Sequence, residues 1–337
     1  MHPATTVVLT EDGSGLRSDW QVPFAVDTGL TLAVHRRGPG DPTFRIDGAG
    51  AVWRTCLTPA GPATIRLTAR QAASRPGGPA AGPEAEQAGP ARHGTDVRAA
   101  SWGPGAGWLL ARVPALLGAA DDPAAFRPAH PRLRELASRY PGLRIGRSDR
   151  VLEALVPAVL EQKVLSIEAY RGWRLLLRWH GLPAPGPAPA GMRVFPPPAT
   201  WRSIPSWDWH RAGVEAVRAR TIAGAALVAG RLEDAARLPG AELDRTLRML
   251  PGIGPWTSAE VRQRACGDAD AVSVGDYHLP SVVGWTLAGE PADDERMLEL
   301  LAPYPGQRYR ATRLIELGGS APPRRGPRLA VRDYRSF

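Results

Sequence analysis

The chain contains few of the residues that build metal centres or covalent catalysts, with two cysteines and a single lysine among 337 residues. Because Cys56 and Cys266 lie far apart in the sequence, they cannot form a C-x-x-C zinc site or a four-cysteine iron–sulfur cluster within one chain. We expect both to be free, buried thiols. A mechanism that requires a lysine nucleophile has one candidate, Lys163.

Long apolar stretches are also missing. No run of about 18 or more apolar residues occurs and no basic segment leads into an apolar one, so we expect no membrane span, no signal peptide and a cytoplasmic location. The length and the 43% hydrophobic content fit a globular chain of two or three domains. A formal net charge of +9 and a pI near 10.4 favour a polyanionic partner.

Residues 20 to about 70 are typical of β structure. Short β-prone runs separated by Gly, Pro and Asp occur at 30–34, 43–46, 52–54 and 64–68. The segment from Gln71 to Asp96 is rich in Pro, Gly and Ala without an apolar period, which predicts a flexible loop. We expect the sheet to resume at Val97 and at 108–111.

Beyond Pro114 the apolar period is helical to about Leu317. Ser148 or Asp149 is expected to cap one helix, and a Pro-rich loop is expected over 182–198. Further helices are predicted over roughly 211–230, 241–250, 255–266, 277–288 and 293–302. The last residues, from Pro322, carry five arginines and one acid. This tail is either solvated or in contact with phosphates.

We therefore predict an α+β protein with three parts. They are a small antiparallel β-sheet domain over 1–114 with a flexible loop at 71–96, an all-helical region over 115–321, and a basic tail over 322–337.

The most informative motif is Leu250-Pro251-Gly252-Ile253-Gly254-Pro255-Trp256-Thr257. Two glycines one residue apart, between two helical patterns, predict a hairpin whose backbone can approach a ligand closely. Such a hairpin presents unpaired N–H groups at a helix N-terminus, where anions bind. In a basic chain the repeating anion is a nucleic-acid phosphate.

Asp276 follows this motif by twenty residues from Trp256, in Val274-Gly275-Asp276-Tyr277. The block from Leu250 to Pro280 resembles the helix-hairpin-helix (HhH-GPD) superfamily of DNA glycosylases, and within it the bacterial 3-methyladenine DNA glycosylase II group. The likeness extends over about 150–317. It implies a monofunctional enzyme of base-excision repair, a monomer associated with the nucleoid, that flips alkylated purines out of duplex DNA and hydrolyses the N-glycosidic bond without a cofactor.

The resemblance also implies roles for individual residues. Gly252, Ile253, Gly254 and Thr257 would hold a DNA phosphate, and the backbone carbonyls of Leu250 and Ile253 would enclose a monovalent cation, with no other metal. Asp276 would stabilise the positive charge that develops on the sugar. The alternative for Asp276 is a helix N-cap, which is compatible with catalysis. Asp268 and Asp270 are rival carboxylates that we expect to be solvated.

The base pocket is expected to contain Trp256, Tyr277 and Glu316. A lysine stands at the position of Trp256 in the bifunctional branch of the superfamily, so tryptophan predicts an enzyme without AP-lyase activity. Glu316 replaces an aromatic residue of the family. It either attracts a cationic base or pairs with an arginine such as Arg313.

Gln162, Lys163 and Val164 match the family's interhelical loop, whose apolar wedge fills the gap left by a flipped nucleotide. Lys163 departs from that pattern, so Val164 or Leu165 is the alternative wedge and Lys163 a phosphate ligand. Two rival functions remain open from the sequence. One is a non-catalytic helix-hairpin-helix protein that binds DNA or senses lesions, and the other is a glycosylase with lyase activity that uses Lys163.

Overall fold

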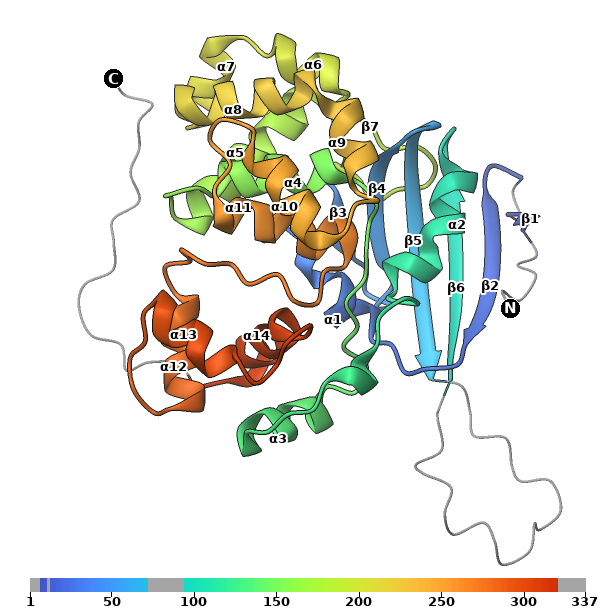
Figure 1. The fold of residues 1–337 in the computed structure, drawn as a ribbon. Coiled ribbons are helices and arrows are strands. Elements are labelled where there is room, and N and C mark those ends of the chain that lie inside the picture. The colour runs from blue at the N-terminus through green and yellow to red at the C-terminus, as the bar shows by residue number, and fades with distance from the viewer. Residues whose placement is uncertain (1–6, 11–12, 72–93, 321–337) are drawn as a thin grey trace, which may run out of the picture.

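A six-stranded antiparallel sheet forms the N-terminal part of the computed structural model, which describes residues 7–10, 13–71 and 94–320 (Figure 1). Most of the predicted flexible loop at 71–96, and the basic tail at 322–337, lie outside these described residues. The strand order is β1-β2-β6-β5-β4-β3. The strands are β1 (Val8–Leu9), β2 (Leu16–Val22), β3 (Phe44–Ile46), β4 (Val52–Thr58), β5 (Gly61–Gln71) and β6 (Thr95–Trp102).

One face of the sheet is covered by helix α2 (Ala106–Leu116), which lies along β5 and β6 (Figure 1). The prediction that the sheet continues through 108–111 is wrong, because these residues belong to α2. Leu109, Val113 and Leu116 recur at helical spacing and bury against Ile65 and Leu67. Four apolar residues in a row do not distinguish a strand from one turn of a buried helix.

The strand predicted at 30–34 is also wrong. Helix α1 (Thr28–Leu32) continues into the 3-10 turn η1 (Ala33–His35). The helix starts where the Asp27 carboxylate accepts a hydrogen bond from the backbone N–H of Leu30 at 2.9 Å. This N-cap decides the conformation of a short apolar run with no strong preference of its own.

The remainder is mainly helical, so the α+β class is confirmed. Its helices are α3 (Pro131–Arg139), α4 (Val151–Leu160), α5 (Ser166–His180), α6 (Pro198–Ser203), α7 (Ser206–Arg211), α8 (Ala216–Leu227), α9 (Ala229–Ala235), α10 (Gly240–Arg248), α11 (Pro255–Val261), α12 (Leu279–Leu287), α13 (Asp294–Leu301) and α14 (Arg308–Gly318). Strands β7 (Leu182–Pro183) and β8 (Arg193–Val194) pair within the expected Pro-rich loop, so the stretch after 115 is not wholly helical.

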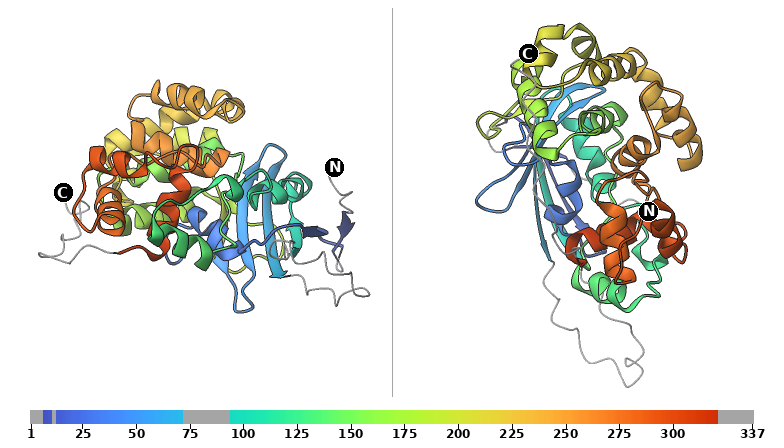
Figure 2. Two further views of the ribbon diagram at one scale, coloured as in Figure 1. Left: turned by 60° about the horizontal axis from the view of Figure 1, so that its bottom comes forward. Right: turned by 90° about the vertical axis from the view of Figure 1, so that its left-hand side faces the viewer.

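Two hydrophobic cores divide these helices. Helix α4 is buried along its whole length in the core that includes α5, α8, α9, α10 and α11. A second core joins α3, α12, α13 and α14. Figure 1 and the right view of Figure 2 show the second group apart from the first, with the chain between α11 and α12 running from one to the other. None of the helices among the described residues is long and apolar enough to cross a membrane.

The start of α4 shows how tertiary contacts replace a local cap. The prediction that Ser148 or Asp149 caps this helix is wrong, because neither side chain accepts a hydrogen bond from its first turn. The Glu233 carboxylate instead accepts hydrogen bonds from the N–H groups of Val151 and Leu152, at 2.8 and 3.2 Å. A side chain from α9, some eighty residues later, therefore satisfies donors that every helix start leaves open.

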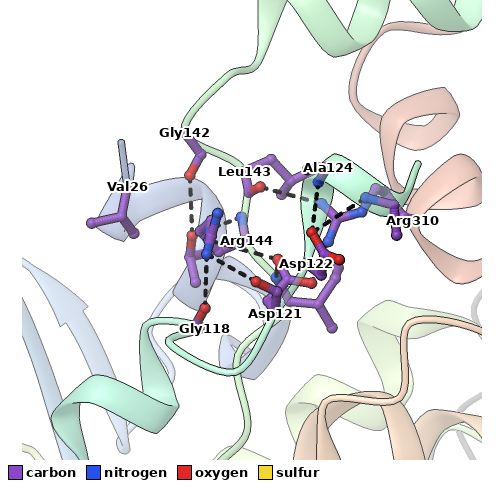
Figure 3. Close-up of polar contacts among 12 residues, drawn as sticks. Val26, Gly118, Asp121, Asp122, Ala124, Gly142, Leu143, Arg144 and Arg310 are labelled. Carbon is purple, nitrogen blue, oxygen red and sulfur yellow. Dashed lines mark hydrogen bonds and ion pairs between the residues drawn. The ribbon is translucent and has the colours of Figure 1, made fainter. Parts of the chain in front are cut away.

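A buried ionic network ties α14 to the segment between α2 and α4 (Figure 3). The side chain of Asp121 is 2% exposed and pairs with Arg310, which is 4% exposed. Arg144 adds a second cation, with its Nε 3.7 Å from Asp121 Oδ2 and its Nη2 donating to the carbonyls of Gly118 and Asp121. Charges so deeply buried are tolerated only when they are paired, so this network fixes the position of α14.

Both cysteines are free thiols, as predicted. Cys56 is fully buried, and burial raises the pKa of its thiol far above the ordinary value. Cys266 is half-buried rather than buried, and burial raises its pKa to about 12. Neither thiol ionises at neutral pH, so neither is a candidate nucleophile.

Candidate functional site

The glycine motif forms a hairpin between α10 and α11. Gly252 has a φ of +87°, and a Cβ placed on it would lie 2.3 Å from Oγ1 of Thr221 on α8. Both the backbone conformation and the close contact therefore require glycine. Gly254 is different, since its φ is −96° and a Cβ placed on it would have no atom within 4 Å. No contact with the part of the chain that the structure describes explains glycine at 254, and the space beside it is open.

Helix α11 begins at this open space. Gly254 is its N-cap residue, Pro255 is its first residue, and no side chain caps it within the described part of the chain. The N–H groups of the first turn have no acceptor inside a helix, and no carbonyl among the described residues accepts from those of Trp256 and Thr257. Thr257 is 2% exposed and Trp256 is half-buried, so the N–H of Trp256 is the more accessible of the two. An uncapped helix start beside open space suits an anion.

The turn between α4 and α5 lies against this hairpin. The Gln162 amide Nε2 donates hydrogen bonds to the carbonyl of Gly252 at 2.9 Å and to Oγ1 of Thr257 at 2.8 Å. Lys163, the next residue, is exposed and has a φ of +54°, which is uncommon for a side chain of this kind. Val164 follows and is half-buried. The structure thus brings the predicted loop and the predicted hairpin together.

Asp276 touches both the hairpin helix and the start of α12. Its Oδ1 accepts hydrogen bonds from the N–H groups of His278 and Leu279, each at 2.8 Å. Its Oδ2 accepts one from the indole N–H of Trp256 at 3.0 Å. Asp276 is therefore a cap, as the alternative interpretation required, and it also lies beside the helix that follows the hairpin. Three N–H donors surround the carboxylate, which suits a negatively charged acceptor.

The three residues expected in a base pocket have different surroundings. Trp256 is half-buried and in contact with Asp276, so it is not a core tryptophan. Tyr277 is 83% exposed and packs edge-on against His278, so its place in a base pocket stays a prediction. Glu316 is 45% exposed and lies 2.6 Å from a guanidinium nitrogen of Arg313, which is the pairing that the sequence left open.

Two further carboxylates were expected to be solvated, and this is wrong for both. Asp268 lies 3.1 Å from the guanidinium of Arg262, with 18% of its side chain exposed. Asp270 accepts a hydrogen bond from Nε of Arg308 at 2.8 Å. Because both carboxylates are neutralised by structural ion pairs, Asp276 is left without a rival in this loop.

A set of charged side chains near Asp276 was not predicted from the sequence. On α11, Glu260 lies one turn after Trp256, and its Oε2 is 2.7 Å from Arg264. At the end of α4, Glu161 Oε1 is 3.3 Å from Nε of Arg37. The spacing of 256, 260 and 264 places these side chains on one helix face, which was the available signal.

The pKa values of Glu161 and Glu316 reflect the burial and the neighbouring charges of these two carboxyls. Burial raises the pKa of Glu161, Arg37 opposes the rise, and the negative charges of Glu260 and Asp276 add to it. Burial also raises the pKa of Glu316, against the effect of Arg313. The side chain of Glu316 is nonetheless 45% exposed, so water reaches part of it. Each carboxyl has its own arginine, so the cluster carries little net charge.

Among the described residues, no group of three or more His, Cys, Asp and Glu side chains is placed to hold a metal ion. The backbone of the hairpin offers oxygens instead. The carbonyl of Leu250 accepts one bond, from the N–H of Ile253 at 3.1 Å.

Comparisons with known proteins concern the fold and the sequence as a whole. No protein-family model matches the sequence. Over 176 residues, which are 50% of this chain, the sequence is 33% identical to a Mycobacterium tuberculosis protein named "Probable bifunctional transcriptional activator/DNA repair enzyme AlkA", in each of two strains. The match covers 34% of that protein, so the chain spans about a third of the length of these curated relatives.

Solved structures share the fold. A 3-methyladenine DNA glycosylase from Archaeoglobus fulgidus has a TM-score of 0.68 and 17% identity, over 88% of this chain and 97% of that one. An 8-oxoguanine glycosylase/lyase from Clostridium acetobutylicum, in complex with double-stranded DNA, has a TM-score of 0.63 and 11% identity, over 92% of this chain and 96% of that one. The resemblance predicted from Leu250–Pro280 is thereby confirmed, because the chain has the fold of the helix-hairpin-helix DNA glycosylases and half of its sequence is 33% identical to the protein named AlkA.

Proposed function

We propose that the protein is a monofunctional DNA glycosylase that removes alkylated purine bases of the 3-methyladenine type from duplex DNA. The observation that carries this proposal is the position of one carboxylate. Trp256 lies on α11, the helix that begins at the glycine hairpin, and its indole Nε1 is 3.0 Å from Oδ2 of Asp276. A phosphate on that helix start would bring the adjoining sugar towards the carboxylate.

In this proposal the hairpin binds the DNA backbone. The N–H groups beside Gly254 donate to a phosphate, and the open space at this glycine admits its oxygens. Lys163, exposed at the tip of the neighbouring turn, pairs with another phosphate, and Val164 fills the gap that the flipped nucleotide leaves. Flipping costs a few kcal/mol, and less for a damaged base.

Asp276 then acts on the sugar. As the N-glycosidic bond breaks, the departing base takes the bonding electron pair and positive charge develops on the sugar ring. A carboxylate beside that ring stabilises the charge, and it can orient the attacking water. Each carboxylate oxygen accepts about two hydrogen bonds, so Oδ2 retains room for water after accepting the indole N–H.

Trp256 supports both the proposed substrate class and the absence of lyase activity. An alkylated purine is electron-poor, and an aromatic face attracts positive charge. Because Trp256 is half-buried, part of its ring is open to a ligand. Schiff-base chemistry needs a lysine amine, and Lys163, the single lysine of the chain, is assigned here to DNA contact.

The hairpin carbonyls fit the monovalent cation that the family places there. On the buried residue Ile253, no hydrogen bond from the described residues reaches the carbonyl, and Leu250 retains a lone pair after accepting one N–H. A cation bound by Leu250 and Ile253 would add positive charge next to the phosphate site.

Release of free base from methylated duplex DNA tests the proposal. We expect release by the wild type, loss of release in Asp276→Asn, and no change in Asp27→Asn, where another carboxylate caps helix α1. Tight DNA binding without release by the wild type would instead identify a non-catalytic DNA-binding or lesion-sensing protein. Borohydride reduction should trap no protein–DNA adduct, whereas an adduct at Lys163 would show lyase chemistry.

A further inference from the structure

A buried polar cluster holds the loop that carries Asp276. The Ser273 hydroxyl donates a hydrogen bond to Oε1 of Glu260 at 2.7 Å. The Gln263 amide Nε2 donates to Oγ of Ser273 and to the carbonyl of Ala271, each at 2.9 Å. Ser273 is 5% and Gln263 is 4% exposed, so these bonds are shielded from water. Buried hydrogen bonds of this kind fix one geometry, since leaving a partner unsatisfied is costly.

The cluster is built on the end of α11 and on the π-helical turn η4 (Arg262–Cys266) that follows it. The second oxygen of Glu260 lies 2.7 Å from Nη1 of Arg264, so both of its oxygens are held. A π-helical turn widens the helix by about one residue per turn, and such turns are frequent at functional sites. Here it allows Gln263 to reach Ser273 while Arg264 pairs with Glu260.

Ser273 is coupled to Asp276 through the backbone. The N–H of Asp276 donates to the carbonyl of Ser273 at 3.2 Å, and the turn between them is completed by Gly275 with a φ of +91°. On the opposite side, the N–H of Gly275 lies 3.1 Å from both carboxylate oxygens of Asp294. The carboxylate of Asp276 therefore projects from a turn whose first residue is anchored by side chains of α11 and η4.

We propose that Ser273, Glu260 and Gln263 are positioning residues that set where Asp276 meets the sugar, an inference that rests on the proposed function. None of the three needs to touch DNA. Because a displacement of about 1 Å at a reacting group can slow a reaction by about 100-fold, this cluster should affect the rate of base release more than DNA affinity.

Single-turnover release of base from methylated duplex DNA tests the inference. For Ser273→Ala we expect release to slow by about 10- to 100-fold, with the Kd for the same duplex within about twofold of the wild type. Glu260→Gln keeps an oxygen that accepts the serine hydroxyl, so it should retain most of the rate that Ser273→Ala loses. Ser101→Ala removes an equally buried hydroxyl, bonded to the carbonyl of Thr64 at 2.9 Å in the sheet, and should release base at the wild-type rate.

A double-mutant cycle separates coupling from independent damage. If Ser273 acts through Glu260, combining Ser273→Ala with Glu260→Ala should slow release no further than Glu260→Ala alone. Additive losses would overturn the inference. If Ser273→Ala does not fold, Gln263→Met removes the two donor bonds while keeping the side-chain length, and it should give the same slow release with unchanged affinity.

Hydrogen exchange of the free protein provides a readout without catalysis. Backbone amides of the segment 275–279 should exchange faster in Ser273→Ala than in the wild type or in Ser101→Ala. If the wild type releases no base, the proposed function fails, while faster exchange still supports the positioning role. Unchanged exchange together with unchanged release would overturn that role.

Discussion

Replacing Gly254 by alanine separates a glycine kept for the fold from one kept for a ligand. At Gly254 the φ of −96° and ψ of −177° suit alanine, and the added methyl would meet no protein atom within 4 Å. Gly to Ala at a compatible position stabilises a protein by about 0.4–1 kcal/mol, because the unfolded chain loses freedom. We therefore expect Gly254→Ala to unfold at the same urea concentration as the wild type or at a higher one.

DNA binding should change in the opposite direction. A methyl group at 254 occupies the space proposed for a phosphate and moves that phosphate away from the N–H groups of α11. A hydrogen bond to a charged group contributes about 1.5–3 kcal/mol, so its loss should raise the Kd by about 10- to 100-fold. Loss of one phosphate contact should also lower the slope of log K against log salt by about one.

Fluorescence anisotropy with a labelled duplex at several salt concentrations measures both quantities. Gly48→Ala is the matched control, since a Cβ there is equally free of neighbours but lies in the turn between β3 and β4. Gly252→Ala should instead destabilise the protein, by about 1–2 kcal/mol for the left-handed backbone alone. Wild-type affinity and salt dependence in Gly254→Ala would refute the assignment of the open space to a phosphate.

Three other changes give separate readouts. Asp121→Asn leaves the buried guanidinium of Arg310 without its charged partner and should lower the free energy of unfolding, measured in urea, by about 3–5 kcal/mol. His35 has a buried Nε2 without a partner among the described residues, and burial together with neighbouring arginines lowers its pKa. Below the unfolded-state pKa of about 6.5 the unfolded chain therefore binds more protons than the folded one. As the pH is lowered from 7 to 5, the free energy of unfolding should fall by up to about 1.4 kcal/mol per pH unit in the wild type and by less in His35→Gln, which urea unfolding at the two pH values measures. Trp256→Phe keeps an aromatic ring, smaller than the indole, but removes the N–H that donates to Asp276. Single-turnover base release should slow by about 10-fold, whereas a rate equal to that of the wild type would show that this hydrogen bond is not needed.

Sequence periodicity was sufficient where an element is long. Helices α8 and α10 to α13 lie within or close to the ranges that the apolar period predicts, because the same buried face recurs over about two turns or more. The errors at 30–34 and 108–111 concern short runs of mostly apolar residues. Their conformation is decided by contacts outside the run, such as the Asp27 cap and the packing of α2 on the sheet, which local preference does not contain.

The candidate site divides in the same way. The hairpin, Trp256 and Asp276 were predicted because they lie within about thirty residues at a recognisable spacing. The residues that hold them were not, since Gln162 meets Thr257 across 95 positions and no local pattern records that contact. Ser273 is an ordinary loop serine until the fold places it against Glu260. Support for a reacting group can come from any part of a chain.

The two interpretations of Asp276, helix cap and catalyst, do not compete for the same oxygen. Oδ1 is occupied by the two N–H groups that start α12, while among the described residues Oδ2 accepts one hydrogen bond, from the indole N–H of Trp256. The cap therefore orients the side chain and leaves Oδ2 with a free lone pair on the side of the hairpin helix. Asparagine at 276 would keep the oxygen that caps and replace the other by an uncharged amide nitrogen. A protein that needs only the cap would tolerate this change, whereas an enzyme that needs negative charge beside the sugar would not.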